Sequence, residues 1–132
     1  MIDMIQILIL GLALGGVYAL MSSGLTLAFG VMRIVNLAHA VLMVAAAYIA
    51  YWGFVLLGID PILSILITVP VMFGVGVVIY KLVFVNIPAG ARFGETTVLL
   101  TFSLALIVEG LLGHAFTNIY RSANPSYATE AI

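Results

Sequence analysis

Residues 4–57 read MIQILILGLALGGVYALMSSGLTLAFGVMRIVNLAHAVLMVAAAYIAYWGFVLL, and they contain one formally charged residue, Arg33. Soluble domains carry charged side chains over their whole surface, and about a quarter of their residues are charged. Here 7% of the residues are charged and 65% are hydrophobic, and the mean hydropathy is +1.34. A chain of 132 residues is too small to bury that much apolar surface in its own interior. The sequence therefore predicts an integral membrane protein covered by lipid.

The composition also excludes several functional classes. The net charge is −1, so no basic surface is available for nucleic acid. The chain has no cysteine, which excludes disulfides and thiolate metal sites, and the spacing of its two histidines does not form a metal site. It has neither a glycine-rich phosphate loop with its lysine nor a set of nucleophile, base and orienting acid. We therefore expect no enzyme activity, no cofactor and no bound metal.

The apolar segments predict about four membrane-spanning helices. A helix needs about 20 apolar residues to cross a hydrocarbon core of about 30 Å. Segments of this kind lie at about residues 5–32, 37–57, 62–80 and 97–116. The first is longer than required, so it must tilt, kink or extend beyond the membrane, with Gly24 and Gly30 as weak points. We expect an all-α polytopic membrane protein in which residues 1–132 form a single transmembrane domain.

The basic residues predict the orientation of the chain. Lys and Arg accumulate on the cytoplasmic side of membrane proteins. With the N-terminus outside, three basic residues fall on the cytoplasmic side: Arg33, Lys81 and Arg92. Three acidic residues then fall on the outer side: Asp3, Asp60 and Glu130. Arg121 is the exception. We interpret Arg33, Lys81 and Arg92 as topology anchors and place the N-terminus outside.

Small residues repeat every fourth position along the first segment: Gly11, Gly15, Ala19 and Ser23. Such a spacing puts them on one helix face, where they allow two helix backbones to approach closely in lipid. The alternative is that membrane helices simply tolerate glycine. We favour a packing face, which indicates that this chain docks against further helices.

A polar cluster, RIVNLAH at residues 33–39, separates the first two segments. Backbone that leaves a helix at membrane depth needs hydrogen-bond partners, and Asn36 and His39 can supply them. One interpretation is that both residues cap helices in a cytoplasmic turn. The other is a broken helix that lines a solute path, as in many transporters. The spacing alone does not separate the two.

Two further residues are candidates for a polar path through the membrane. Glu109 is the one acidic residue well inside a predicted span, and a buried carboxylate in lipid is functional by default. Its alternative role is to reach the outer headgroups. Thr26 is the second candidate, although a hydroxyl in a helix commonly bonds to its own backbone.

The stretch from Gly24 to His39, GLTLAFGVMRIVNLAH, resembles the opening of bacterial branched-chain amino-acid ABC-importer permeases. That family typically has a Gly-hydrophobic-Thr helix followed by Asn, an apolar residue, Ala and His. Residues 11–20, GLALGGVYAL, are similar too. Residues 99–110, LLTFSLALIVEG, resemble the family's fourth span, which commonly bears Glu or Gln at the position of Glu109. Permeases for urea and short amides share these features.

The chain departs from the family pattern in two respects. Ala40 follows His39 where the family usually has Gly, and Val41 stands where an acidic or small residue is common. Ala40 should stiffen this turn and limit close approach of another backbone. Family members are also about twice as long, so we expect the chain to correspond to the N-terminal half of an ABC-importer permease.

The resemblance implies a transmembrane permease subunit of an ATP-driven importer for branched-chain amino acids in the bacterial inner membrane. It implies four partners besides lipid: a second, homologous permease subunit, two cytoplasmic ATPase subunits and an external solute-binding protein that delivers the amino acid. ATP hydrolysis would belong to the partner subunits. Three alternatives remain open: a non-transporting anchor or assembly subunit, a small self-associated channel, and a permease of the same family for urea or short amides.

Overall fold

The computed structural model describes residues 2–117, and all regular structure in this part of the chain is helical. The helices are α1 (Ile2–Met32), α2 (His39–Leu57), α3 (Ile65–Ile79), the π-helical turn η1 (Tyr80–Phe84) and α4 (Phe93–Phe116). Four helical segments are long and apolar enough to cross a membrane, with η1 extending α3. The predicted all-α architecture with four spanning helices is confirmed.

The helix ends follow local chemistry. α1 ends at Met32 and α2 at Leu57, where the predicted segments end. Gly58 closes α2 in the left-handed conformation, with φ 63°, and its N–H and that of Ile59 bond to carbonyls of the last turn. α4 begins at Phe93, four residues before the predicted start at Thr97. The earlier start includes Glu95, because an acidic side chain is favourable in the first turn of a helix.

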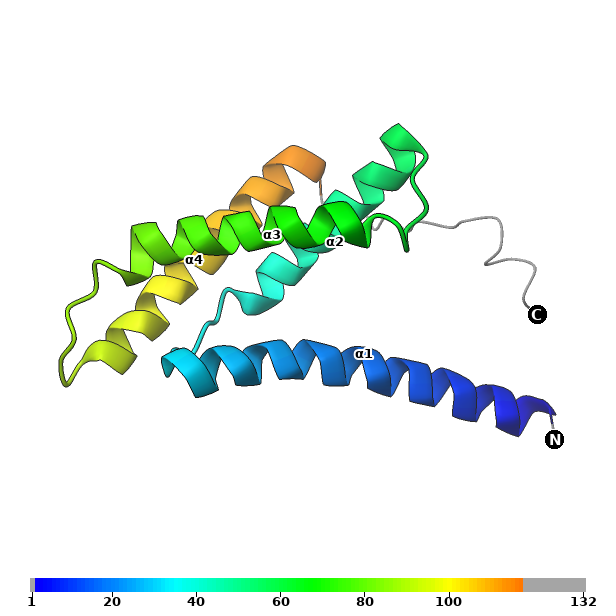
Figure 1. Ribbon diagram of the computed structural model, residues 1–132, viewed down its shortest axis with the longest axis horizontal. Coiled ribbons are helices and arrows are strands. Elements are labelled where there is room, and N and C mark those ends of the chain that lie inside the picture. The colour runs from blue at the N-terminus through cyan, green and yellow to red at the C-terminus, as the bar shows by residue number, and fades with distance from the viewer. Residues whose placement is uncertain (1, 118–132) are drawn as a thin grey trace.

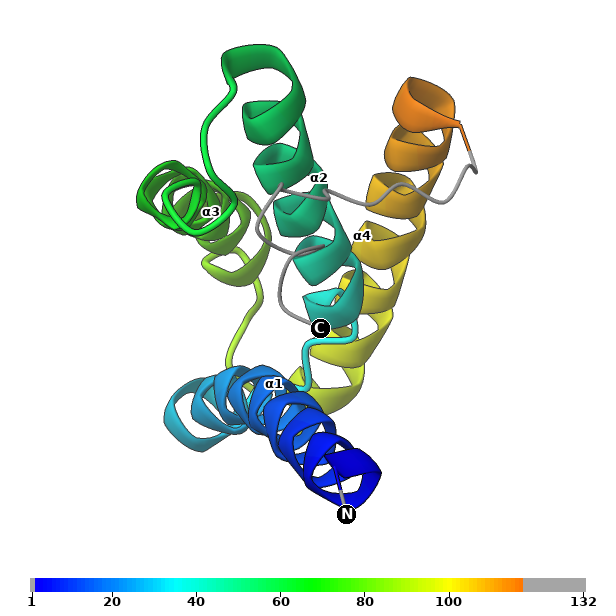
Figure 2. The same cartoon turned by 90° about the vertical axis from the view of Figure 1, so that its right-hand side faces the viewer.

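The four helices are not equally packed (Figure 1). Helices α2, α3 and α4 form a group, whereas α1 approaches this group only toward its C-terminal end, as the second view also shows (Figure 2). Every residue from Asp3 to Ser23 is exposed, and the first partly buried residue of α1 is Gly24. α1 is continuous through Gly24 and Gly30, and its 31 residues extend over about 46 Å.

The interior of the described chain is small, and apart from Ile34 it consists of small side chains. The buried residues are Ile34, Ala38, Ser64, Thr97, Thr101 and Ala105. Large apolar side chains face outward on all four helices; for example, Leu12 is 82% exposed and Phe73 is 74% exposed. Lipid must cover this surface, as the composition predicts.

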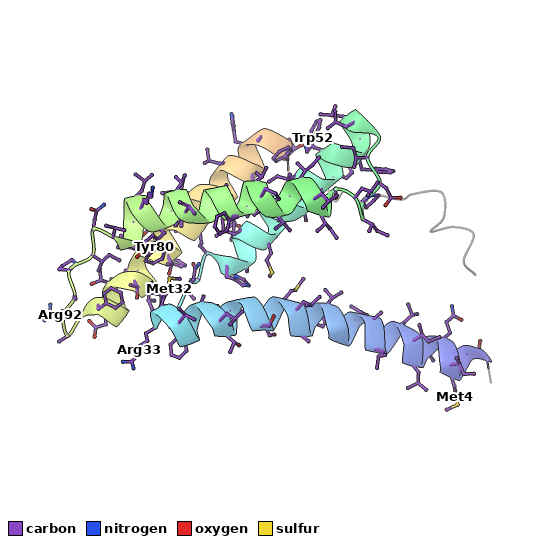
Figure 3. The ribbon with its side chains drawn as sticks, in the orientation of Figure 1. Met4, Met32, Arg33, Trp52, Tyr80 and Arg92 are labelled. Carbon is purple, nitrogen blue, oxygen red and sulfur yellow. The ribbon has the colours of Figure 1, made fainter. Side chains whose placement is uncertain are left out.

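The basic residues gather at one end of the molecule. Arg33 follows α1 and Arg92 precedes α4, and Figure 3 shows both at the end opposite Met4 and Trp52. Lys81 lies in η1, which also belongs to this end (Figure 1). Glu95, which the sequence analysis did not consider, lies near Arg92 in the first turn of α4. Arg121 and Glu130 lie outside the described residues.

Candidate functional site

The break between α1 and α2 spans residues 33–38 and has a defined conformation. Arg33 closes α1 with a positive φ of 54°, and its N–H donates to the carbonyl of Phe29 at 2.8 Å. A non-glycine residue in this region of backbone space is strained. Asn36 stabilises the backbone that leads into α2. Its Oδ1 accepts a hydrogen bond from the N–H of Ala38 at 3.0 Å, and its carbonyl accepts one from the backbone N–H of His39 at 3.2 Å. The break is therefore a structured element.

Thr101 of α4 holds this break in place. Its hydroxyl is fully buried and accepts a hydrogen bond from the N–H of Leu37 at 3.2 Å. The same hydroxyl lies 3.2 Å from the carbonyl oxygen of Val35, and also within bonding distance of the Thr97 and Val98 carbonyls, at 2.8 and 3.1 Å. A hydroxyl has one proton, so these three carbonyls compete for it. We call these contacts the Thr101 clasp.

The packing around the clasp depends on small residues. Thr97, Thr101 and Ala105 are four residues apart on α4 and are the buried residues of that helix. Against this face the break buries Ile34, which is 3% exposed, and Ala38, which is 0% exposed. The sequence analysis missed this face, although its period of four is the same pattern that drew attention to α1.

His39 connects the start of α2 to α1. Its Nε2 lies 3.2 Å from the carbonyl oxygen of Met21, which makes Nε2 the donor of this contact. A Cβ atom built on Gly24 would lie 3.2 Å from Cε1 of His39, so any larger residue at this position would require the imidazole to shift by a few tenths of an ångström. Gly24 is thus a contact point between α1 and α2, and α1 continues through it without interruption.

Asn36 and His39 line one pocket, together with residues of α1. The pocket has a volume of about 330 Å³, and its other lining residues are Met21, Ser22, Leu25, Leu37, Ala40 and Met43. Thr26 does not line it; its hydroxyl donates to the carbonyl of Ser22 at 2.8 Å. The structure therefore brings together two of the four predicted path residues.

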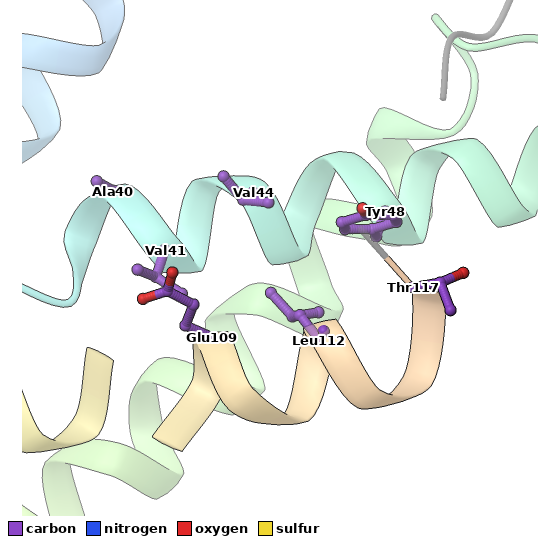
Figure 4. A pocket seen from close by; sticks show the side chains of 8 residues that line it. Ala40, Val41, Val44, Tyr48, Glu109, Leu112 and Thr117 are labelled. Carbon is purple, nitrogen blue, oxygen red and sulfur yellow. The ribbon is translucent and has the colours of Figure 1, made fainter. Parts of the chain in front are cut away.

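Glu109 lies in a second pocket, of about 290 Å³, between α2 and α4. Figure 4 shows its carboxylate beside Val41, in the first turn of α2. The remaining lining residues are Ala40, Val44, Tyr48, Leu112, Gly113 and Thr117. Ala40 lines both pockets, so Asn36 with His39 and Glu109 lie on opposite sides of the N-terminal end of α2.

The predicted packing face of α1 is open. A Cβ atom added at Gly11 or Gly15 would meet nothing within 4 Å, and Ala19 and Ser23 are exposed. The hydroxyl of Ser23 donates to the carbonyl of Leu20 at 2.7 Å, within the helix itself. This face is available to a helix outside the chain, and its role in packing stays a prediction.

A comparison with protein families identifies the family to which the chain belongs. A family profile described as the permease component of the branched-chain amino acid transport system matches residues 7–130. The chain belongs to this permease family. The match includes the break between α1 and α2 as well as the α2–α4 pocket, and it confirms the resemblance seen in the sequence. No curated protein and no solved structure matches the chain.

Transport permeases move solutes, and the polar groups among the described residues could contact a solute. Residues 2–117 contain no group of three or more His, Asp or Glu side chains that could hold a metal ion. The two candidate pockets contain a pair of hydrogen-bonding side chains at the helix break and a single carboxylate between α2 and α4. Both are suited to polar contacts with a passing solute or with a neighbouring helix.

Proposed function

We propose that this permease is a translocation subunit of an ATP-driven importer for branched-chain amino acids, and that the break between α1 and α2 borders the solute path. One observation carries the proposal: Asn36 and His39 line the same pocket at a break that the Thr101 clasp fixes to α4. Irregular backbone at membrane depth is tolerated where it is held by protein or borders a water-filled cavity. Transporters commonly place polar contacts at such breaks.

The partners follow from what a permease of this kind lacks. It carries no phosphate-binding loop, so two cytoplasmic ATPase subunits would supply the energy. A second, homologous permease would complete the cavity, and an external solute-binding protein would deliver the amino acid. Rocking of the two permeases would then expose the cavity to one side at a time. With few charges in the membrane, the pore would discriminate weakly, and specificity would lie mainly in the external receptor.

The location of the basic residues supports an orientation in the bacterial inner membrane. Arg33 and Arg92 gather at one end of the helices (Figure 3). The positive-inside rule puts this end in the cytoplasm and the N-terminus outside. The break would then lie near the cytoplasmic end of the path. Fusion of a reporter to the loop after Ile59 should give activity in the periplasm and none in the cytoplasm.

Uptake by the assembled importer tests this function. The chain, the second permease, the ATPases and the binding protein are reconstituted in proteoliposomes, and the uptake of labelled leucine is measured. Asn36→Ala and His39→Ala should each reduce the rate about tenfold, because each removes a polar contact worth about 1.4 kcal/mol in the path. Co-purification of all subunits should stay unchanged.

Matched substitutions exist outside the break. Asn86→Ala and His114→Ala remove the same side chains from exposed positions on η1's flank and on α4. Importers with either substitution should take up leucine at a rate within about twofold of that of the unchanged chain, since ordinary surface substitutions have small effects. Normal uptake by both Asn36→Ala and His39→Ala, with assembly intact, would favour an anchor or assembly subunit. Uptake of urea in place of leucine would reassign the solute.

A further inference from the structure

The α2–α4 pocket contains a carboxylate for which the described chain provides no partner. Glu109 makes no hydrogen bond or ion pair within residues 2–117. It lies seven residues before the end of α4 at Phe116, which corresponds to about 10 Å along the helix axis. With about 36 Å of helix around a core of about 30 Å, this depth is inside the hydrocarbon. An unpaired carboxylate there cannot face lipid chains.

Among residues 2–117, Arg33, Lys81 and Arg92 are too far away to neutralise it, and His114, five residues further along α4, forms no ion pair with it. Arg92 precedes α4, and Glu109 lies 16 residues beyond the first residue of that helix, about 24 Å along its axis. Arg33 and Lys81 belong to the same distant end of the molecule (Figures 1 and 3). His39 is directed toward Met21 on the other side of α2. The partner of Glu109 therefore comes from outside the described chain.

The residues that line the pocket indicate the size and polarity of that partner. Val41, Val44 and Leu112 present hydrocarbon, while the carboxylate at one end can only accept hydrogen bonds (Figure 4). A volume of about 290 Å³ leaves room for a small organic molecule. One carboxylate is too few ligands for Ca²⁺ or Mg²⁺, which require about six oxygen atoms.

We infer that the α2–α4 pocket binds a small organic ammonium with a short branched apolar body, with Glu109 as the residue that receives the ammonium group. This inference rests on the proposed function in one respect: the ammonium is that of the transported amino acid. Tyr48 lines the same pocket, and its hydroxyl has no hydrogen-bond partner among the described residues. It can donate to the carboxylate of such a substrate, which Glu109 alone would repel.

The chain has no cysteine, so one introduced thiol can report occupancy of the pocket. Val44→Cys places that thiol on the pocket wall. The full chain is placed in lipid nanodiscs, and the rate of alkylation of this thiol is measured with and without 3-methylbutylamine. The amine should slow alkylation about tenfold, which corresponds to a charge-assisted contact of about 1.4 kcal/mol. A thiol at Val85→Cys, which is exposed outside the pocket, should react at an unchanged rate.

Two further ligands and three variants of Glu109 test whether protection depends on the charge of the ammonium group or only on the shape of the apolar body. 4-Methylpentanoate and 3-methylbutanol have similar apolar bodies without the ammonium, and neither should protect the thiol. Glu109→Gln and Glu109→Leu should abolish protection by the amine, whereas Glu109→Asp should retain part of it because it keeps the charge. Helix content measured by circular dichroism verifies that each variant is folded. Equal protection by the alcohol or the acid, or protection that survives Glu109→Leu, would overturn the site.

The assembled importer distinguishes this inference from the proposed function. Leucine uptake that proceeds normally while the amine gives no protection overturns the ammonium site and leaves the proposed function intact. Protection without any uptake supports the site and contradicts the importer. A different result would contradict the ligand proposal. Assembly with the second permease would then block alkylation of the thiol in the absence of amine, and Glu109→Gln would reduce co-purification of that permease. Glu109 would in that case pair with a cation of the second permease.

Discussion

The break at residues 33–38 and the part of α1 that precedes Gly24 differ in almost every physical respect. The break buries Ile34 and Ala38 and bonds to α4 through Thr101. In α1 every residue from Asp3 to Ser23 is exposed, and all three glycines of this stretch, Gly11, Gly15 and Gly16, face open space. The chain thus uses its internal contacts to fix an irregular segment, while its most regular helix depends on lipid or on other helices. Irregular backbone needs specific partners, whereas a helix satisfies its own hydrogen bonds.

The largest effect on the stability of the chain should come from Thr101→Val. Valine has nearly the same shape as threonine but leaves the partly buried Leu37 N–H without its acceptor, and it removes the proton for which the Val35 carbonyl competes. We expect the free energy of unfolding to fall by about 2 kcal/mol, because unsatisfied buried groups are costly. Denaturant titration in detergent micelles, followed by circular dichroism, measures it.

Thr101→Ser provides the matched control, since it keeps the hydroxyl and loses a methyl group. It should retain most of the stability, and Ser103→Ala, which removes an exposed hydroxyl of α4, should change little. A Thr101→Val chain as stable as the unchanged protein would show that the clasp does not hold the break.

A smaller effect should distinguish two glycines of α1. Gly24→Ala and Gly15→Ala gain the same helix propensity, about 0.5–1 kcal/mol. At Gly24 the new methyl group would lie 3.2 Å from His39, and displacing that ring weakens its bond to Met21, whereas at Gly15 it meets nothing. Gly24→Ala should therefore be less stable than Gly15→Ala by about 1 kcal/mol.

The same denaturant titration measures this difference, and a double variant identifies its cause. In a His39→Ala background the two substitutions should become equal, because the ring that the methyl group meets is gone. A difference that persists without His39 would assign the penalty to something other than the contact between α1 and α2.

The smallest effect on the chain itself should come from Gly15→Leu, whose side chain points into open space. We expect no loss of stability of the chain, and at most the gain of about 0.5–1 kcal/mol that replacing a helical glycine brings. If the predicted packing face docks against another helix, recovery of the second permease in co-purification should fall severalfold, because a large side chain keeps the backbones apart. Gly16→Leu, which lies beside this face, is the matched control. Equal recovery of both variants would contradict the packing face.

The sequence predicted those features that depend on neighbours along the chain. Arg33 and Gly58 mark the ends of α1 and α2, and the hydropathy of each segment gave four spanning helices. The start of α4 was placed four residues too late because the prediction followed the apolar segment, which begins at Thr97, and the first turn of the helix contains Gly94 and Glu95. Local charge is compatible with the first turn of a helix as well as with a loop, so composition does not separate them there.

Features that depend on distant residues escaped the sequence analysis. The partners of Thr101 are 64 and 66 residues away along the chain, and threonine in an apolar helix ordinarily bonds to its own backbone. Asn36, His39 and Glu109 were recognised as unusual from their polarity alone. That Asn36 and His39 share one pocket and Glu109 lines another follows only from the position of α2 between α1 and α4.

The attachment of α1 at one end has a mechanical consequence. From Met21, where His39 contacts it, to Ile2, the helix extends over about 28 Å with no support from α2, α3 or α4. A rotation of about 10° at that pivot would carry the tip through about 5 Å, the length of one helical turn. A displacement of this size is large enough to shift a neighbouring helix on the opposite side of the bilayer.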